Sequence, residues 1–234
     1  MIKNKGVIVV SLGGSLILED DATINVNYLK KFKDALKKHT NKYKFIVVTG
    51  GGSIARKYIS ALEDIGIKDH KLQSMAGISA TRMNARFLSY FFNQNPEKGI
   101  PHKMNEIISY LKKQEIVFAG ALEYQPHQTS DGTAAEIAEH FKSDFINLTN
   151  VAGLYNKNPK KHKDAKFISS ISWKAFHKMA NAIKYKPGQH FVLDQTAAKI
   201  IMDKKIKTYI LGSNLKDLNN LLNGKKFKGS IING

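Results

Sequence analysis

Two junctions constrain this chain more than any other feature of its sequence, because at each one an apolar, β-branched run stops at consecutive glycines. The run Phe45–Val48 is followed by Gly50–Gly52, and Val7–Val10 is followed by Gly13-Gly14. Runs of this kind predict buried strands, while glycine adopts positive φ easily and lets a ligand approach the backbone closely. Since the first amides of a following helix can bind an anion, the junctions predict two phosphate-binding turns.

Arg56 lies one turn into the helix expected after Gly50–Gly52, where a planar guanidinium can hold a phosphate bidentately. Neither junction matches the P-loop pattern G-x-x-x-x-G-K-S/T, and the dinucleotide fingerprint G-x-G-x-x-G is absent as well. A nicotinamide-dependent dehydrogenase is therefore not expected. For Gly13-Gly14 taken alone, an ordinary tight turn explains the glycines as well as phosphate contact does.

Strand-like and helix-like segments alternate along the whole chain. We expect strands at Val7–Val10, Phe45–Val48, Ile116–Ala119, Phe145–Leu148 and Thr208–Leu211. We expect helices around Tyr28–Leu36, at Ile54–Leu62, Met75–Phe92, Met104–Leu111, Ala134–Phe141, Thr196–Met202 and Leu215–Leu222. Strands separated by helices indicate βαβ units, so the predicted class is α/β with a mostly parallel sheet covered on both faces.

Size and composition allow one large domain or two lobes, since the chain has 234 residues of which 42% are hydrophobic. We treat residues 1–234 as a single domain with a functional division near Lys142, between lobes 1–142 and 143–234. No apolar run is long enough to span a bilayer, and the start of the chain does not resemble a signal peptide. The chain has no cysteine, which excludes disulfides and thiolate metal sites and leads us to expect a cytoplasmic protein without a membrane partner.

A net charge of +18 is compatible with two kinds of partner. Nucleic acid is one, through neutralisation of phosphates; anionic metabolites are the other. The lysines are spread along the chain on polar helix faces, and no basic stripe carries the interleaved aromatic residues typical of RNA-binding surfaces. Nucleic acid is therefore not the expected partner.

Two polar loops in the second half of the chain each follow an expected strand. In Gln125–Gly132 the hydroxyls of Thr129 and Ser130, with Asp131, either cap a helix or contact a substrate; His127 is a binding residue at most. In the loop 149–161, Tyr155 either flanks an adenine or belongs to an ordinary polar turn. Lys160 or Lys161 then either lies near a triphosphate or is simply solvated. Helix capping alone is enough to explain Asp194.

Taken together, these segments resemble the amino-acid kinase superfamily, and within it the archaeal type of UMP kinase. The resemblance covers nearly the whole chain and rests on seven segments, which are specific in their order and spacing. They are LGGS (Leu12–Ser15), TGGGSIARKYI (Thr49–Ile59), GISATRMNA (Gly77–Ala85), PHQTSD (Pro126–Asp131), TNVAGLYNKNPKK (Thr149–Lys161), LDQTAAKII (Leu193–Ile201) and GSII (Gly229–Ile232).

The resemblance implies a three-layer αβα sandwich that transfers the γ-phosphoryl group of ATP to UMP, a step of pyrimidine nucleotide biosynthesis, with Mg²⁺ as cofactor. It also implies a homohexamer assembled as a trimer of dimers. The positions that match UMP-binding residues are Gly51, Arg56, Ser74, Gln125, Pro126, His127, Gln128 and Thr129. Those that match the ATP site are Gly13, Gly14, Ser15, Gly52, Thr149, Asn150, Tyr155 and Asn158.

We expect Gly14, Arg56 and Lys160 to be catalytic, because phosphoryl transfer depends mainly on positioning and charge stabilisation. The Gly14 turn is expected to stabilise charge on the transferring phosphoryl group, Arg56 to anchor the acceptor's phosphate, and Lys160 or Lys161 to add positive charge. No side chain is assigned as a dedicated metal ligand. Mg²⁺ is expected to arrive with ATP and to be held by waters, with Asp131 and Asp194 as the carboxylates to consider.

Four positions depart from the superfamily pattern. Ser11 and Phe191 stand where many members have lysine, Ser74 stands where an aspartate contacts the UMP ribose, and Asn158 stands where aspartate is usual. Two alternatives therefore stay open. One is a kinase of the same fold that acts on another small phosphate or carboxylate, and the other is a non-catalytic nucleotide-binding protein.

Overall fold

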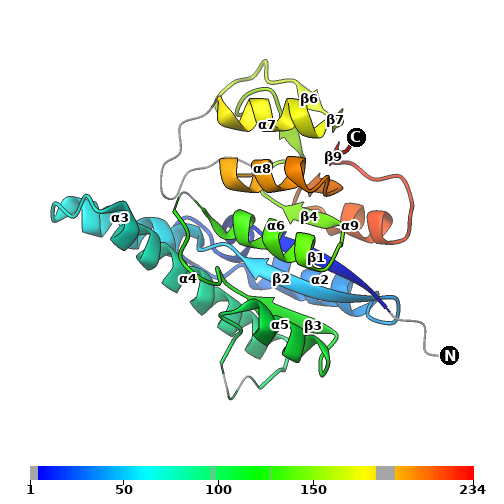
Figure 1. Cartoon of the computed structure of the whole chain (residues 1–234), viewed down its shortest axis with the longest axis horizontal. Helices are drawn as coiled ribbons and strands as arrows, with labels where there is room; N and C mark the ends of the chain where they lie inside the picture. The colour runs from blue at the N-terminus through cyan, green and yellow to red at the C-terminus, as the bar shows by residue number, and fades with distance from the viewer. Residues whose placement is uncertain (1–4, 96, 98, 127, 183–192) are drawn as a thin grey trace.

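The computed structural model describes residues 5–95, 97, 99–126, 128–182 and 193–234. Figure 1 shows strands in the middle of the molecule and helices on either side of them. The strands are β1 (Gly6–Leu12), β2 (Tyr43–Thr49), β3 (Ile116–Ala119), β4 (Phe145–Leu148), β5 (Leu154–Tyr155), β6 (Phe167–Ile168), β7 (Ser170–Ile171), β8 (Thr208–Leu211) and β9 (Ser230–Ile232). The helices are α1 (Gly14–Ile17), α2 (Val26–Lys37), α3 (Gly52–Asp64), α4 (His70–Phe91), α5 (Met104–Leu111), α6 (Ser130–His140), α7 (Trp173–Asn181), α8 (Gln195–Asp203) and α9 (Leu215–Leu222).

Seven strands form one sheet in the order β3-β2-β1-β4-β8-β9-β7. All neighbouring pairs are parallel except β8 with β9. The register places Val10 of β1 between Val47 of β2 and Ile146 of β4. The predicted α/β class with a mostly parallel sheet is confirmed.

Alternate residues of each central strand point to opposite faces of the sheet. On β1, Val10 and Leu12 belong to the apolar core that includes α2, α4 and α9, whereas Val9 belongs to the core that includes α5, α6, α7 and α8. Val9 and Val10 are both completely buried, as expected of a parallel strand covered on both faces. Each such side chain stabilises the fold by about 1.5–3 kcal/mol. The two cores make the molecule the three-layer αβα sandwich that the family resemblance implies.

Local sequence explains why the helices begin and pack as they do. Asn25 caps α2 by accepting a hydrogen bond from the Tyr28 amide at 3.1 Å. Leu29, Phe32 and Leu36 follow at helical spacing and are completely buried. The predicted face of this helix is thus confirmed.

Some elements were not expected, namely α1, β5, β6, β7, α7 and β9. Most of them are only two to four residues long, which is too short for a periodic pattern. β9 becomes a strand by pairing antiparallel with β8. α4 also begins earlier than expected, at His70, because Asp69 caps it by accepting a hydrogen bond from the Lys71 amide at 2.7 Å.

The sheet brings several strand ends together at one edge. Because β1, β2, β4 and β8 are parallel, the residues after each of them emerge on the same side. Hydrogen bonds extend the ladder past the strands, from the Gly50 amide to the Leu12 carbonyl and from the Gly13 amide to the Leu148 carbonyl, both at 2.9 Å. In open α/β sheets, this carboxyl edge is where ligands bind.

Candidate active site

A cavity of about 950 Å³ opens at this edge of the sheet. Most of the residues predicted from the sequence line it together: Gly13, Gly14, Ser15, Gly51, Gly52, Arg56, Ser74, Gln125, Gln128, Thr129, Thr149, Asn150, Tyr155, Asn158 and Lys160. Pro126 is exposed and is not among the lining residues. His127 and Phe191 lie outside the described residues.

The two glycine turns pack directly on each other at the floor of the cavity. A Cβ atom on Gly14 would lie 2.1 Å from the Gly52 nitrogen, and one on Gly50 would lie 2.6 Å from the Gly14 nitrogen. Gly52 also has φ +63°. The glycines are therefore required by backbone contact between the turns, a reason that the sequence did not reveal.

This packing leaves amides available in the cavity. α3 begins with Gly51 as its N-cap, and no side chain caps it, so its first amides are free to bind an anion. Asn84 of α4 fixes the turn from behind by donating a hydrogen bond to the Gly50 carbonyl at 2.8 Å. Asn84 is almost completely buried, which gives the segment Gly77–Ala85 a structural role in holding the turn.

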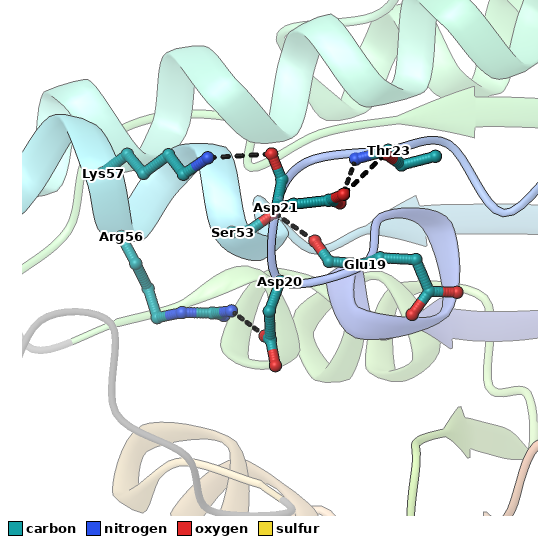
Figure 2. A network of polar contacts seen from close by, with 7 residues as sticks. All are labelled: Glu19, Asp20, Asp21, Thr23, Ser53, Arg56 and Lys57. Carbon is teal, nitrogen blue, oxygen red and sulfur yellow. Dashed lines mark hydrogen bonds and ion pairs between the residues drawn. The ribbon is translucent and has the colours of Figure 1, made fainter.

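Arg56 faces the cavity from the second turn of α3, as expected, and it has an acidic partner. Its Nη2 atom lies 3.0 Å from Oδ1 of Asp20, as Figure 2 shows. Asp20 belongs to residues 18–25, which we call the acidic loop, and it also lines the cavity. The sequence analysis did not include this carboxylate.

A cluster of polar side chains lies deeper, beneath the start of α6. Asp131 Oδ1 accepts hydrogen bonds from the Ser11 hydroxyl at 2.6 Å and from Asn147 Nδ2 at 3.1 Å. The surrounding protein, then the charge of Asp194, raise the pKa of Asp131 to about 7, while the Ser11 hydrogen bond opposes the rise. Oδ1 of Asn147 is buried without a hydrogen-bond partner among the described residues. Asn147 was missed, although a polar residue inside the apolar strand Phe145–Leu148 was a usable signal.

The capping interpretation of Thr129 and Asp194 is confirmed. Thr129 caps α6, accepting a hydrogen bond from the Asp131 amide at 3.2 Å. Asp194 caps α8 by accepting from the Ala197 amide at 2.6 Å. Asp194 also accepts from the Thr129 amide at 3.0 Å and hydroxyl at 2.5 Å, so it joins the beginnings of the two helices.

The side chains of Gln125 and Gln128 both donate to one carboxylate. Gln125 Nε2 lies 3.0 Å from Oε1 of Glu136, and Gln128 Nε2 lies 3.1 Å from Oε2. Glu136 belongs to α6. These amides are therefore held at the cavity wall by the helix that begins there.

Many residues of the loop 149–161 also line the cavity. The half-buried ring of Tyr155 packs edge-on against Phe167, with centroids 5.4 Å apart. Asn158 Oδ1 accepts a hydrogen bond from the Lys160 amide at 2.9 Å, so this asparagine shapes the turn. Lys160 is exposed and lines the cavity.

Within the part of the chain that the structure describes, no group of three or more histidine, aspartate or glutamate side chains is placed to hold a metal ion. In the same residues, no helix is long and apolar enough to cross a membrane.

The fold and the cavity define an α/β protein whose cavity is lined by two glycine turns after parallel strands, and whose sequence has neither a P-loop nor a dinucleotide-binding fingerprint. Residues 6–212 match the model of the amino acid kinase family, and the chain belongs to this family. The uridylate kinase of Thermoplasma volcanium is 37% identical over 221 residues, which cover 93% of each chain. That of Methanobrevibacter smithii is 30% identical over 227 residues, covering 96% of this chain and 98% of the relative.

A solved structure supports the same relationship. The uridylate kinase from Archaeoglobus fulgidus superimposes with a TM-score of 0.79 at 31% identity, covering 96% of this chain and 99% of the other. The resemblance expected from the motifs is confirmed.

Proposed function

We propose that this chain transfers the γ-phosphoryl group of ATP to UMP, giving ADP and UDP. The observation that carries the proposal is that one cavity is lined by both glycine turns, by Arg56 and by residues of the loop 149–161. The relatives that cover nearly the whole chain carry the name uridylate kinase.

We assign the two ends of the cavity to the two substrates. The acceptor end belongs to residues 1–142, where Arg56, Ser74, Gln125, Gln128 and Thr129 line the cavity. The ATP end belongs to residues 143–234 together with Gly13–Ser15 and Gly52, and includes Thr149, Asn150, Tyr155 and Asn158. In this proposal Gly13–Ser15 and Gly52 are the residues of the first lobe that contribute to the ATP end.

In the proposed reaction, an oxygen of the UMP phosphate attacks the γ-phosphorus of ATP. The bond from that phosphorus to the β–γ bridging oxygen breaks, and ADP leaves. The barrier is mainly electrostatic and positional, since two anions must meet in line. The amides at Gly14 and Gly52 would stabilise charge on the transferring group, Arg56 would anchor the acceptor phosphate, and Lys160 would add positive charge at the ATP end.

The polar cluster on the cavity floor suits the Mg²⁺ that accompanies ATP. Mg²⁺ prefers oxygen ligands, and Asp131 and Asn147 both line the cavity. Among the described residues, Oδ1 of Asn147 has no hydrogen-bond partner. Asp194 is less suitable, because Thr129 and Ala197 already occupy its oxygens. Bound Mg²⁺ would neutralise phosphate charge, and Asp131 and Asn147 would hold it directly or through its waters.

We also propose that the protein is cytoplasmic, as its lack of cysteine suggests, and that it forms a homohexamer built from dimers. Leu72, Met75, Met83 and Tyr90 are exposed along one face of α4, and this stripe would pack against a second copy of the chain. Met83→Glu should then lower the mass measured by light scattering, whereas an unchanged mass would exclude this contact.

A coupled ADP-release assay across UMP, CMP, AMP and GMP tests the function. Isopentenyl phosphate and acidic amino acids belong in the same panel, since Ser74 provides only a hydroxyl where an acceptor ribose would be bound. Release that is fastest with UMP supports the proposal. If ADP release is faster with another acceptor, that compound is the substrate in place of UMP. Nucleotide binding without any ADP release would indicate a non-catalytic protein.

A further inference from the structure

The acidic loop is held against α3 by groups other than the Asp20 side chain. The Ser53 hydroxyl donates to the Glu19 carbonyl at 2.7 Å, and Lys57 Nζ donates to the Asp21 carbonyl at 2.9 Å. Figure 2 shows both contacts, which involve the residues before and after Asp20 in the chain. The position of the loop therefore does not depend on the Asp20 carboxylate.

The Asp20 side chain is fully exposed, at 101% relative accessibility, whereas the Arg56 side chain is 30% exposed. Their contact at 3.0 Å joins one guanidinium nitrogen to one carboxylate oxygen. Exposed pairs of this kind contribute little to stability, so the contact is not needed to maintain the fold. Both residues line the cavity, and the pair thus lies where a ligand can reach it.

We propose that Asp20 is a placeholder for the acceptor phosphate: it holds the Arg56 guanidinium at the cavity and is displaced when the substrate phosphate binds. A carboxylate and a phosphate compete for the same donors of arginine, and the phosphate carries more charge and more acceptor oxygens. Asp20 therefore weakens acceptor binding and disfavours singly charged ligands that cannot displace it. This inference rests on the proposed role of Arg56.

Competition between Asp20 and the acceptor phosphate predicts the direction and the size of the change in KM for UMP when the Asp20 charge is removed. Asp20→Asn keeps the shape of the side chain but removes its charge, so it should lower the KM for UMP by about two- to fivefold, as expected for an exposed ion pair. The KM for ATP and kcat should change little, because Arg56 contacts only the acceptor. If Asp20 instead served to orient Arg56, the KM for UMP would rise.

The experiment measures steady-state KM and kcat for UMP in the full chain and four variants: Asp20→Asn, Glu19→Gln, Arg56→Ala and the double variant Asp20→Asn/Arg56→Ala. Glu19→Gln is the matched control, because it removes one charge from the same loop and its side chain points away from Arg56 (Figure 2). Circular dichroism melting checks that every variant is folded.

The inference holds if Asp20→Asn lowers the KM for UMP, Glu19→Gln does not, and the effect disappears in the Arg56→Ala background. An unchanged or raised KM for Asp20→Asn overturns it. An equal decrease with Glu19→Gln, or one that persists without Arg56, would also overturn it, because the loop would then act through its general field. The proposed role of Arg56 fails separately, if Arg56→Ala leaves the KM for UMP unchanged.

Discussion

Two carboxylates face the same cavity from different surroundings. Asp20 is fully exposed and pairs with the cationic Arg56 at 3.0 Å. Asp131 is half-buried in the first turn of α6 and accepts hydrogen bonds from the neutral side chains of Ser11 and Asn147. Desolvation by the surrounding protein, and then the charge of Asp194, raise the pKa of Asp131 to about 7.

The comparison shows that the surroundings of a carboxylate determine how strongly its charge affects binding and stability. Water screens the pair formed by Asp20, so that its effect on binding is small and depends on salt. The low dielectric around Asp131 strengthens every electrostatic interaction there and makes its charge costly unless a cation is present. Substitutions at Asp131 should therefore have large effects, and those at Asp20 small ones.

The largest expected effect is the loss of activity in Asp131→Asn. The amide oxygen can still accept the hydrogen bonds from Ser11 and Asn147, but the charge that would hold Mg²⁺ is gone. We expect kcat to fall by at least about 100-fold, measured by ADP release. Asp203→Asn, which alters an exposed carboxylate on α8, is the control and should keep nearly full activity; comparable losses in both variants would contradict the special role of Asp131.

The same variant should become more stable at high pH. Since the folded-state pKa of Asp131 is about 7, above the ordinary 3.8, its ionisation opposes folding, and this cost develops as pH rises from about 4 to about 7. At pH 8, Asp131→Asn should exceed the wild-type chain in free energy of unfolding by about 1–3 kcal/mol, a value reduced for partial solvent access. Urea unfolding of both proteins near pH 4 and at pH 8 measures this difference in free energy. If the difference between the variant and the wild-type chain is the same at both pH values, the prediction is wrong.

Arg56→Ala should raise the KM for UMP by about one to two orders of magnitude, because a charge-assisted bidentate contact contributes about 1.5–3 kcal/mol. Lys57→Ala is the matched control: it removes the neighbouring cation of α3, which binds the Asp21 carbonyl and is not among the cavity-lining residues. Its KM for UMP should stay within about twofold of wild type. An unchanged KM in Arg56→Ala would remove Arg56 from the acceptor site.

Ser11→Ala tests how the Ser11 hydrogen bond affects the pKa of Asp131. The Ser11 hydrogen bond lowers the pKa of Asp131, so its removal should raise that pKa by about half a unit to one unit, the equivalent of about 1 kcal/mol. Carbon-13 NMR of the aspartate carboxyls in the ligand-free protein measures the shift. A pKa that stays constant or falls would show that Ser11 does not stabilise the charged form.

The smallest effect is the salt dependence of Asp20→Asn. Its expected two- to fivefold change in the KM for UMP should shrink toward none at about 0.5 M salt, where charges are screened within a few ångströms. The loss of kcat in Asp131→Asn should persist at the same salt, because enclosed charges are screened much less. If salt reduced the effects of both substitutions equally, the proposed difference in screening between Asp20 and Asp131 would be wrong.

Local patterns in the sequence predicted much of the architecture. The strands Ile116–Ala119, Phe145–Leu148 and Thr208–Leu211 have the expected bounds, because each is a short, mostly apolar run buried on both faces. β9 was missed, since its three residues become a strand only by pairing with β8.

The candidate site was predicted in its residue types but not in its contacts. Arg56 was expected to face a phosphate, yet its partner Asp20 lies 36 positions away in the chain and no sequence pattern links the two. Ser11 was noticed only as a departure from the family pattern. Its hydrogen bond to Asp131 spans 120 positions and depends on how α6 packs over the sheet.

The alternation of strands and helices and the two glycine turns can be predicted from neighbouring residues, because apolar periodicity and the absence of a side chain act locally. Three further features follow from the folded molecule: the turns contact each other, Gly14 is required because its backbone meets that of Gly52, and two carboxylates enter one cavity in opposite surroundings. No local pattern predicts these features, because burial and charge pairing depend on which distant segments the sheet brings together.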